Sequence, residues 1–126
     1  MKPDQPVVHV IDDDEAVRDS ISMLFETENI EHVVYASATD FLNAYDDAMC
    51  GCLVLDVRMP NMTGLELQEA LNKRHSTLPI IFITGHGDIP MAVEAMRRGA
   101  LDFLRKPFGS ALLVDRIRMA LADSAD

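Results

Sequence analysis

The most constraining feature of this sequence is a repeated alternation of short apolar runs with longer stretches of helical pattern. Runs such as Leu53–Leu55 and Ile80–Ile83 contain only aliphatic and aromatic residues. Uninterrupted apolar runs of this kind are typical of strands covered on both faces, as in a parallel sheet. The predicted strands are Val7–Ile11, His32–Tyr35, Cys52–Leu55, Ile80–Ile83 and Asp102–Leu104.

The stretches after these strands begin with residues that cap helices. Thr63 and Glu66 form a capping-box pattern, in which each side chain bonds the other's backbone N–H. For the fourth helix we expect Ala92, Val93 and Met96 on the inner face and an end at Gly99. The other predicted caps are Asp14, Ser37 with Asp40, Asp88 ahead of the first-turn Pro90, and Ser110.

Five strand–helix pairs in alternation predict an α/β fold of the (βα)₅ type. Because crossovers between parallel strands are right-handed, the helices cover both faces of the sheet. The expected strand order is 2-1-3-4-5, a doubly wound, flavodoxin-like arrangement. The chain has 126 residues, which fits a single domain over 1–126.

Charge and composition exclude several classes of function. Eleven Lys and Arg against 21 Asp and Glu give a net charge of −10, so direct contact of this domain with DNA is unfavourable. No apolar run approaches the roughly 20 residues that span a bilayer, and we expect a cytoplasmic protein without membrane contact. The histidines lack metal-ligand spacing, and Cys50 and Cys52 are interpreted as small buried hydrophobes at the start of a strand.

Polar residues follow four of the five predicted strands, at the edge where open α/β sheets bind ligands. Asp12 and Asp13 follow the first strand and Asp56 the third, while Thr84 and Lys106 follow the fourth and fifth. Two carboxylates about 4 Å apart repel by roughly 4 kcal/mol at an effective dielectric constant of 20, so this group needs a cation. An open carboxylate site with room for water suits Mg²⁺.

This set of groups indicates phosphoryl transfer. It offers a carboxylate nucleophile (Asp56), a metal to offset charge, a hydroxyl (Thr84) and an ammonium (Lys106), and such transfer needs mainly positioning and charge stabilisation. We see no Ser, Cys or His beside a base that would support acyl transfer. Short loops leave little room for a metabolite.

Four motifs occur in order along the chain, and they are Asp12-Asp13, Asp56 to Gly64, Thr84-Gly85-His86-Gly87, and Lys106-Pro107-Phe108. With these motifs the sequence resembles the receiver domain of two-component response regulators. The resemblance covers nearly the whole chain, and the segment Thr84–Val93 looks most like FixJ-type regulators. Such regulators carry a LuxR-type helix-turn-helix output domain after the receiver, which implies that this chain is the N-terminal part of a longer regulator.

The resemblance assigns a phosphoacceptor and a metal site. Asp56 would take a phosphoryl group from the phosphohistidine of a sensor histidine kinase. Asp13, Asp56 and the backbone carbonyl of Arg58 would hold Mg²⁺, with Asp12 acting through water. The domain would catalyse only its own phosphorylation and dephosphorylation, and is not otherwise an enzyme.

The resemblance also implies a switch. Lys106 would pair with the phosphoryl oxygens, and its bond to Pro107 would be cis, a geometry common only before proline. Thr84 would move toward the phosphoryl group and let Phe103 turn inward, which would change the face of the fourth helix and fifth strand. That change would promote a homodimer and control transcription.

Three residues fall on positions where the family varies or departs from its pattern. Phe103 has no hydroxyl, which removes any switch based on a tyrosine hydrogen bond, and by composition alone it is a core residue. Arg58 could shield the acyl phosphate or steer water, with an effect on lifetime of unpredicted sign. Gly85 would leave the site open to water or small phosphodonors.

Two other classes share parts of this pattern. Haloacid dehalogenase-type phosphatases need an acidic residue two positions after the nucleophile, where this chain has Arg58, and a cap for which it has no room. Flavin binders of this fold need a Ser-, Thr- or Gly-rich loop after the first strand, whereas Asp12, Asp13 and Asp14 would repel a phosphate.

Overall fold

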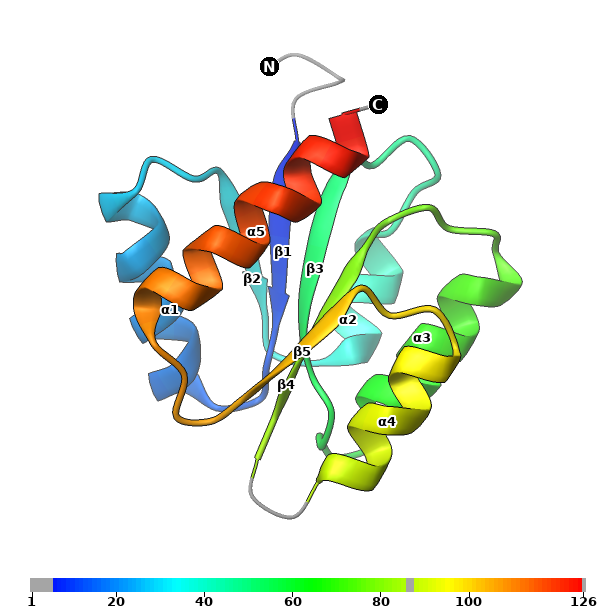
Figure 1. Cartoon of the computed structure of the whole chain (residues 1–126). Helices are drawn as coiled ribbons and strands as arrows, with labels where there is room; N and C mark the ends of the chain where they lie inside the picture. The colour runs from blue at the N-terminus through cyan, green and yellow to red at the C-terminus, as the bar shows by residue number, and fades with distance from the viewer. Residues whose placement is uncertain (1–5, 86–87, 126) are drawn as a thin grey trace.

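The computed structural model describes residues 6–85 and 88–125, which form one parallel sheet with helices on both faces (Figure 1). The strands lie in the order β2-β1-β3-β4-β5, as predicted. The elements are β1 Val7–Ile11, α1 Glu15–Thr27, β2 His32–Tyr35, α2 Ala38–Ala44, β3 Gly51–Asp56, α3 Gly64–Lys73, β4 Ile80–Thr84, α4 Ile89–Arg97, β5 Asp102–Arg105 and α5 Ser110–Ala125.

The core consists of two layers, one on each face of the sheet. Helices α1 and α5 pack on one face through residues such as Phe25, Leu113 and Ile117. Helices α2, α3 and α4 pack on the other, where Phe41 and Leu67 are completely buried (Figure 1). Every residue of β3 and β4 is buried, which explains their uninterrupted apolar sequences.

Local hydrogen bonds confirm three of the predicted caps. The Asp14 side chain accepts a hydrogen bond from the Ala16 N–H, and that of Ser37 accepts one from Asp40 N–H. Thr63 forms the complete capping box with Glu66. These caps set where α1, α2 and α3 begin, and hence where the preceding loops leave the sheet.

Helix α4 departs from its predicted pattern in two respects. Its buried residues are Ala92 and Ala95, whereas Val93 and Met96 are 49% and 37% exposed. Small side chains let a short helix lie close to the sheet, so the larger apolar residues are left outward. Asp88 occupies the N-cap position, but its side chain makes no capping hydrogen bond.

Two smaller features complete the description. Cys52 is buried in β3 as predicted, but Cys50 before it is only half-buried. Gly51 has a φ of +129°, and a Cβ there would lie 1.9 Å from the Val7 carbonyl oxygen, so only glycine allows β3 to begin against β1.

Over residues 6–85 and 88–125, each helix is too short or too polar to cross a bilayer.

Candidate functional site

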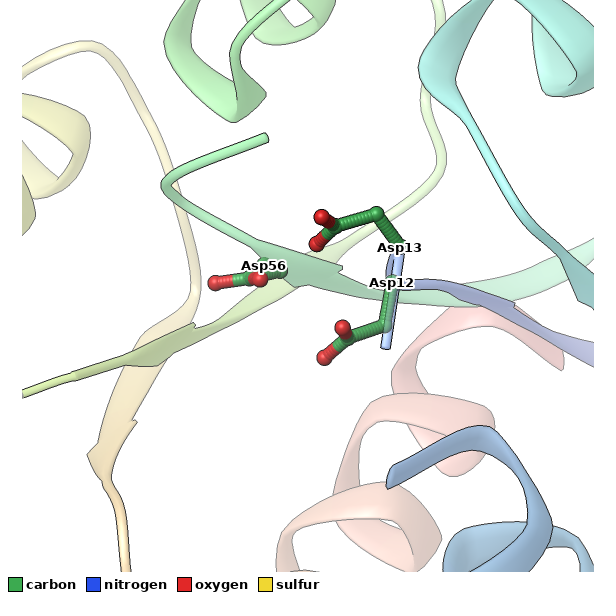
Figure 2. Close-up of side chains that lie close together, drawn as sticks. All are labelled: Asp12, Asp13 and Asp56. Atoms are coloured by element: carbon green, nitrogen blue, oxygen red, sulfur yellow. The ribbon is translucent and has the colours of Figure 1, made fainter. Parts of the chain in front are cut away.

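Three carboxylates meet at the carboxyl edge of the central strands (Figure 2). Asp12 directly follows β1 and Asp56 ends β3, and these strands are neighbours in register, with Ile11 opposite Leu55. One oxygen from each of Asp12, Asp13 and Asp56 lies within 4.8 Å of the other two. Asp12 and Asp56 are buried while Asp13 is exposed, so the cluster opens to solvent on one side.

Lys106 supplies positive charge to this cluster. Its Nζ lies 3.5 Å from Asp12 Oδ2 and 3.9 Å from Asp56 Oδ2. The backbone N–H of Lys106 donates to the Thr84 carbonyl at 2.8 Å, which ties the segment after β5 to the end of β4. The Lys106–Pro107 peptide bond is cis. The ammonium is thus held on the same sheet edge as the carboxylates.

Burial changes the acidity of the two inner carboxylates. Burial, and then the charge of Asp12, raises the pKa of Asp56 to about 6, while Lys106 and the Arg58 N–H act in the opposite direction. Burial also raises the pKa of Asp12, against the Asp14 N–H and Lys106. A single ammonium therefore does not compensate the negative charge of this pocket.

The donor set fits a hard divalent cation. Asp12 Oδ1 accepts a hydrogen bond from the Asp14 N–H at 2.9 Å, but its buried Oδ2 accepts none within the described part of the chain. Carboxylate oxygens on an edge open to water are the ligands that Mg²⁺ prefers. The three carboxylates can hold such an ion, and a contribution from the Arg58 carbonyl remains a prediction.

Thr84 and Phe103 lie on the neighbouring strands β4 and β5. Thr84 ends β4 and is completely buried, with its hydroxyl 3.5 Å from the Leu104 carbonyl oxygen. Phe103 in β5 is half-buried and packs against the core on the α2–α4 face. The switch assigned to these residues from sequence remains a prediction.

Several contacts that shape the site could not be predicted from the sequence, although Arg58 and Gly64 lie in a motif named above. Arg18 of α1 donates to the Asp12 carbonyl at 2.7 Å, which anchors the end of β1 from six residues away. A Cβ at Gly64 would lie 2.4 Å from the Asp56 carbonyl oxygen, so glycine permits α3 to start against β3. The Arg58 side chain binds Asp88, 30 residues later in the chain.

Taken together, the fold and site define a doubly wound domain with an acidic, metal-compatible cluster at the carboxyl edge of its sheet. A family model for the response regulator receiver domain matches residues 8–118. The chain belongs to this family, whose members are the phosphoacceptor signalling domains of two-component systems. It is accordingly a signalling domain and not a conventional enzyme.

The chain is similar to part of several proteins named as transcriptional or response regulators. It is 48% identical over 124 residues to the transcriptional regulatory protein FixJ of Azorhizobium caulinodans, covering 98% of this chain and 59% of the relative. It is 48% identical over 115 residues to the response regulator protein TodT of Pseudomonas putida, covering 91% and 51%. The chain therefore spans little more than half the length of these relatives.

Solved structures agree with the fold. The structure titled FixJ-N is similar, with a TM-score of 0.88 and 41% identity, over 97% of this chain and 96% of that one. Response regulator StyR gives a TM-score of 0.90 and 45% identity, over 96% and 61%. The five-stranded order and flanking helices are those of the receiver family.

Proposed function

We propose that Asp56 is the phosphoacceptor of this receiver domain. Its carboxylate ends a buried central strand, faces the Asp12–Asp13 pair across the sheet edge, and lies 3.9 Å from the Lys106 ammonium. This convergence of one nucleophile with a cation site and a fixed positive charge is the observation that carries the proposal. A pKa of about 6 leaves Asp56 mostly ionised, and so nucleophilic, at pH 7.

In the proposed reaction, a carboxylate oxygen of Asp56 attacks the phosphorus of a phosphohistidine on a sensor histidine kinase. A P–O bond forms as the P–N bond breaks, and the electron pair of that bond stays on the imidazole nitrogen, which takes a proton from solvent if needed to remain neutral. The Lys106 ammonium is placed to pair with a phosphoryl oxygen. The product is an acyl phosphate on Asp56.

Asp12, Asp13 and Asp56, with the carbonyl of Arg58, would hold the Mg²⁺ that receivers of this family bind. When bound, the ion supplies positive charge that offsets the phosphoryl oxygens and the carboxylates themselves. The Oδ2 of Asp12 supports this assignment, because that buried atom accepts no hydrogen bond from the described residues and has only the Lys106 ammonium, 3.5 Å away, as a positively charged neighbour among them.

The output of phosphorylation would be a change in the surface of α4 and β5. In this scheme the Thr84 hydroxyl turns toward the phosphoryl group and Phe103 moves inward, which promotes a homodimer. The outward Val93 and Met96 of α4 offer apolar area for such a contact. In a longer, cytoplasmic regulator, a helix-turn-helix output domain would contact DNA, and this acidic domain would not.

The decisive experiment is intact-protein mass spectrometry after incubation with Mg²⁺ and acetyl phosphate. We expect one phosphoryl adduct, absent in Asp56→Asn and absent when Mg²⁺ is chelated. An adduct that survives in Asp56→Asn would place the acceptor elsewhere. Sedimentation of the phosphorylated chain tests the dimer separately, since an unchanged profile removes the dimer and leaves the acceptor.

A further inference from the structure

The two ends of helix α4 are held by different kinds of contact. At its start, the Arg58 guanidinium donates to Asp88 Oδ1 from Nε at 3.0 Å and from Nη2 at 2.6 Å. The Arg58 side chain is 69% exposed, whereas that of Asp88 is 7% exposed. The start of α4 is therefore joined by an ion pair to the loop that follows the proposed phosphoacceptor.

The other end of α4 is joined to α3 by neutral hydrogen bonds. Gln68 Nε2 donates to the Ala95 carbonyl at 2.9 Å, and Asn72 Nδ2 donates to the Arg98 carbonyl at 3.2 Å. Gln68 is buried, so its bond is shielded from water. A change of charge at the phosphoacceptor would disturb these bonds far less than it would disturb an ion pair.

The ion pair engages the Asp88 carboxylate, which could otherwise cap the start of α4. An aspartate at the N-cap position ordinarily accepts a hydrogen bond from the second or third backbone N–H of its helix. In α4 the second residue is Pro90, which has no N–H, so the Met91 N–H is the donor within reach of such a cap. Because Asp88 makes no cap, α4 starts without this stabilisation while Arg58 is bound.

Arg58 is also close to the site where negative charge would appear. It is two residues from Asp56, and its backbone N–H donates to Asp56 Oδ1 at an N···O distance of 3.4 Å. The pKa of Arg58 is raised first by Asp88 and, to a smaller extent, by Asp56, so its guanidinium lies within the field of both carboxylates. An acyl phosphate on Asp56 carries a charge of about −2 where the carboxylate carried −1, and its oxygens accept hydrogen bonds from arginine strongly.

We propose that the Arg58–Asp88 ion pair is a latch that holds the start of α4 in the unphosphorylated arrangement, and that phosphorylation of Asp56 opens it. The phosphoryl group competes with Asp88 for the guanidinium, and the released Asp88 carboxylate caps α4 through the Met91 N–H. Gln68 and Asn72 keep the far end in place, so the change is concentrated at the start of the helix. This inference rests on the proposed phosphoacceptor role of Asp56.

Nuclear magnetic resonance of the whole chain tests the latch, with the Arg58 Nε–H signal and amide exchange at Met91–Ala95 as readouts. We expect acetyl phosphate with Mg²⁺ to shift the Arg58 signal. Without acetyl phosphate, Asp88→Asn should produce the same pattern of α4 amide shifts, because the asparagine side chain can still cap the helix. The rate of amide hydrogen exchange in α4 should change by about fivefold, which is the upper range expected for an ion pair with one exposed partner.

The matched control is Glu94→Gln, which removes a carboxylate from the same helix. Glu94 pairs with Arg98 at 2.8 Å and with Arg97 at 3.9 Å, both away from the latch. This variant should leave the Arg58 signal and the Met91 amide unchanged. If Asp88→Asn fails to fold, Arg58→Gln replaces it, because the Arg58 side chain is exposed. If both variants fold, their effects on the α4 amides should not add in the double variant, since each removes the same ion pair.

The outcomes separate the latch from the phosphoacceptor. An adduct on Asp56 with an unshifted Arg58 signal, or an Asp88→Asn spectrum that matches the unphosphorylated parent, overturns the latch alone. Failure of the parent chain to form any adduct on Asp56 overturns the proposed function, and the latch with it.

Discussion

The sheet edge that carries the acidic cluster and the α4–β5 face next to it are built in opposite ways. Strands β1 and β3 are almost wholly buried, and the ends that carry Asp12 and Asp56 are fixed by backbone bonds on both sides. Helix α4 has nine residues, its inner face is two alanines, and its N-cap side chain is turned to another loop. The difference is consistent with the proposed switch, because an event of a few kcal/mol can move a weakly held helix but not the end of a buried strand.

The largest expected effect on stability comes from the buried negative charge of Asp56 at the sheet edge. Burial raises the pKa of Asp56 from 3.8 to about 6, so between these values the folded chain binds more protons than the unfolded chain. The free energy of unfolding therefore falls as pH rises through this window in Mg²⁺-free buffer. We expect Asp56→Asn to be more stable than the parent at pH 7 by about 1–3 kcal/mol.

Urea denaturation at pH 7 and at pH 4, with and without Mg²⁺, measures this difference. The gain should vanish at pH 4, where the parent is also protonated, and shrink with saturating Mg²⁺, which stabilises the folded parent. An equal gain at both pH values would mean that the substitution acts through packing and not through charge.

A second substitution tests the rigidity of the same sheet edge. The Cβ of Gly64→Ala would lie 2.4 Å from the Asp56 carbonyl oxygen and 3.0 Å from the Phe82 ring, so α3 or β3 must shift. We expect a loss of about 1–3 kcal/mol in unfolding free energy, together with slower adduct formation from acetyl phosphate. Gly109→Ala is the control, because a Cβ there meets nothing within 4 Å. Normal phosphorylation in Gly64→Ala would show that the edge tolerates movement.

A third change tests the local cap of α3, on the rigid side of the comparison. Thr63→Ala removes the hydroxyl that accepts from the Glu66 N–H, and leaves the reciprocal bond from the Thr63 backbone N–H to the Glu66 side chain. The expected cost is about 1 kcal/mol in thermal or urea unfolding. Thr63→Ser keeps the hydroxyl and should recover most of that cost, whereas an equal loss in both variants would assign the effect to the methyl group.

The smallest effect on stability is expected on the α4 face. Met96→Ala and Val93→Ala remove exposed side chains and should change unfolding free energy by less than about 0.5 kcal/mol. The same variants should weaken the self-association of the phosphorylated chain in sedimentation. Ala95→Leu, on the buried side of the helix, is the contrast, and should cost about 1–3 kcal/mol through overpacking. Unchanged association in Met96→Ala and Val93→Ala would move the dimer contact elsewhere.

Prediction from sequence succeeded where a short stretch of chain carries the whole signal. The uninterrupted apolar runs predict buried strands, and Asp14, Ser37 and Thr63 cap their helices through neighbours two or three residues away. The gathering of Asp12, Asp13 and Asp56 also follows from sequence, because parallel strands end at a common edge. The prediction of the inner face of α4 was wrong, because Ala95 and not Met96 faces the core. Helical periodicity alone does not choose between two adjacent apolar faces.

By itself the sequence determined the alternation of strands and helices, their order in the sheet and the identity of the residues at the strand ends. Only the tertiary structure decided that Arg58 reaches Asp88, that Arg18 anchors the Asp12 carbonyl, and that Gly64 must lack a side chain beside Asp56. The physical reason is that caps and apolar periodicity are set within one element and its flanking residues. Each of these three contacts joins two segments, and depends on how those segments pack against each other.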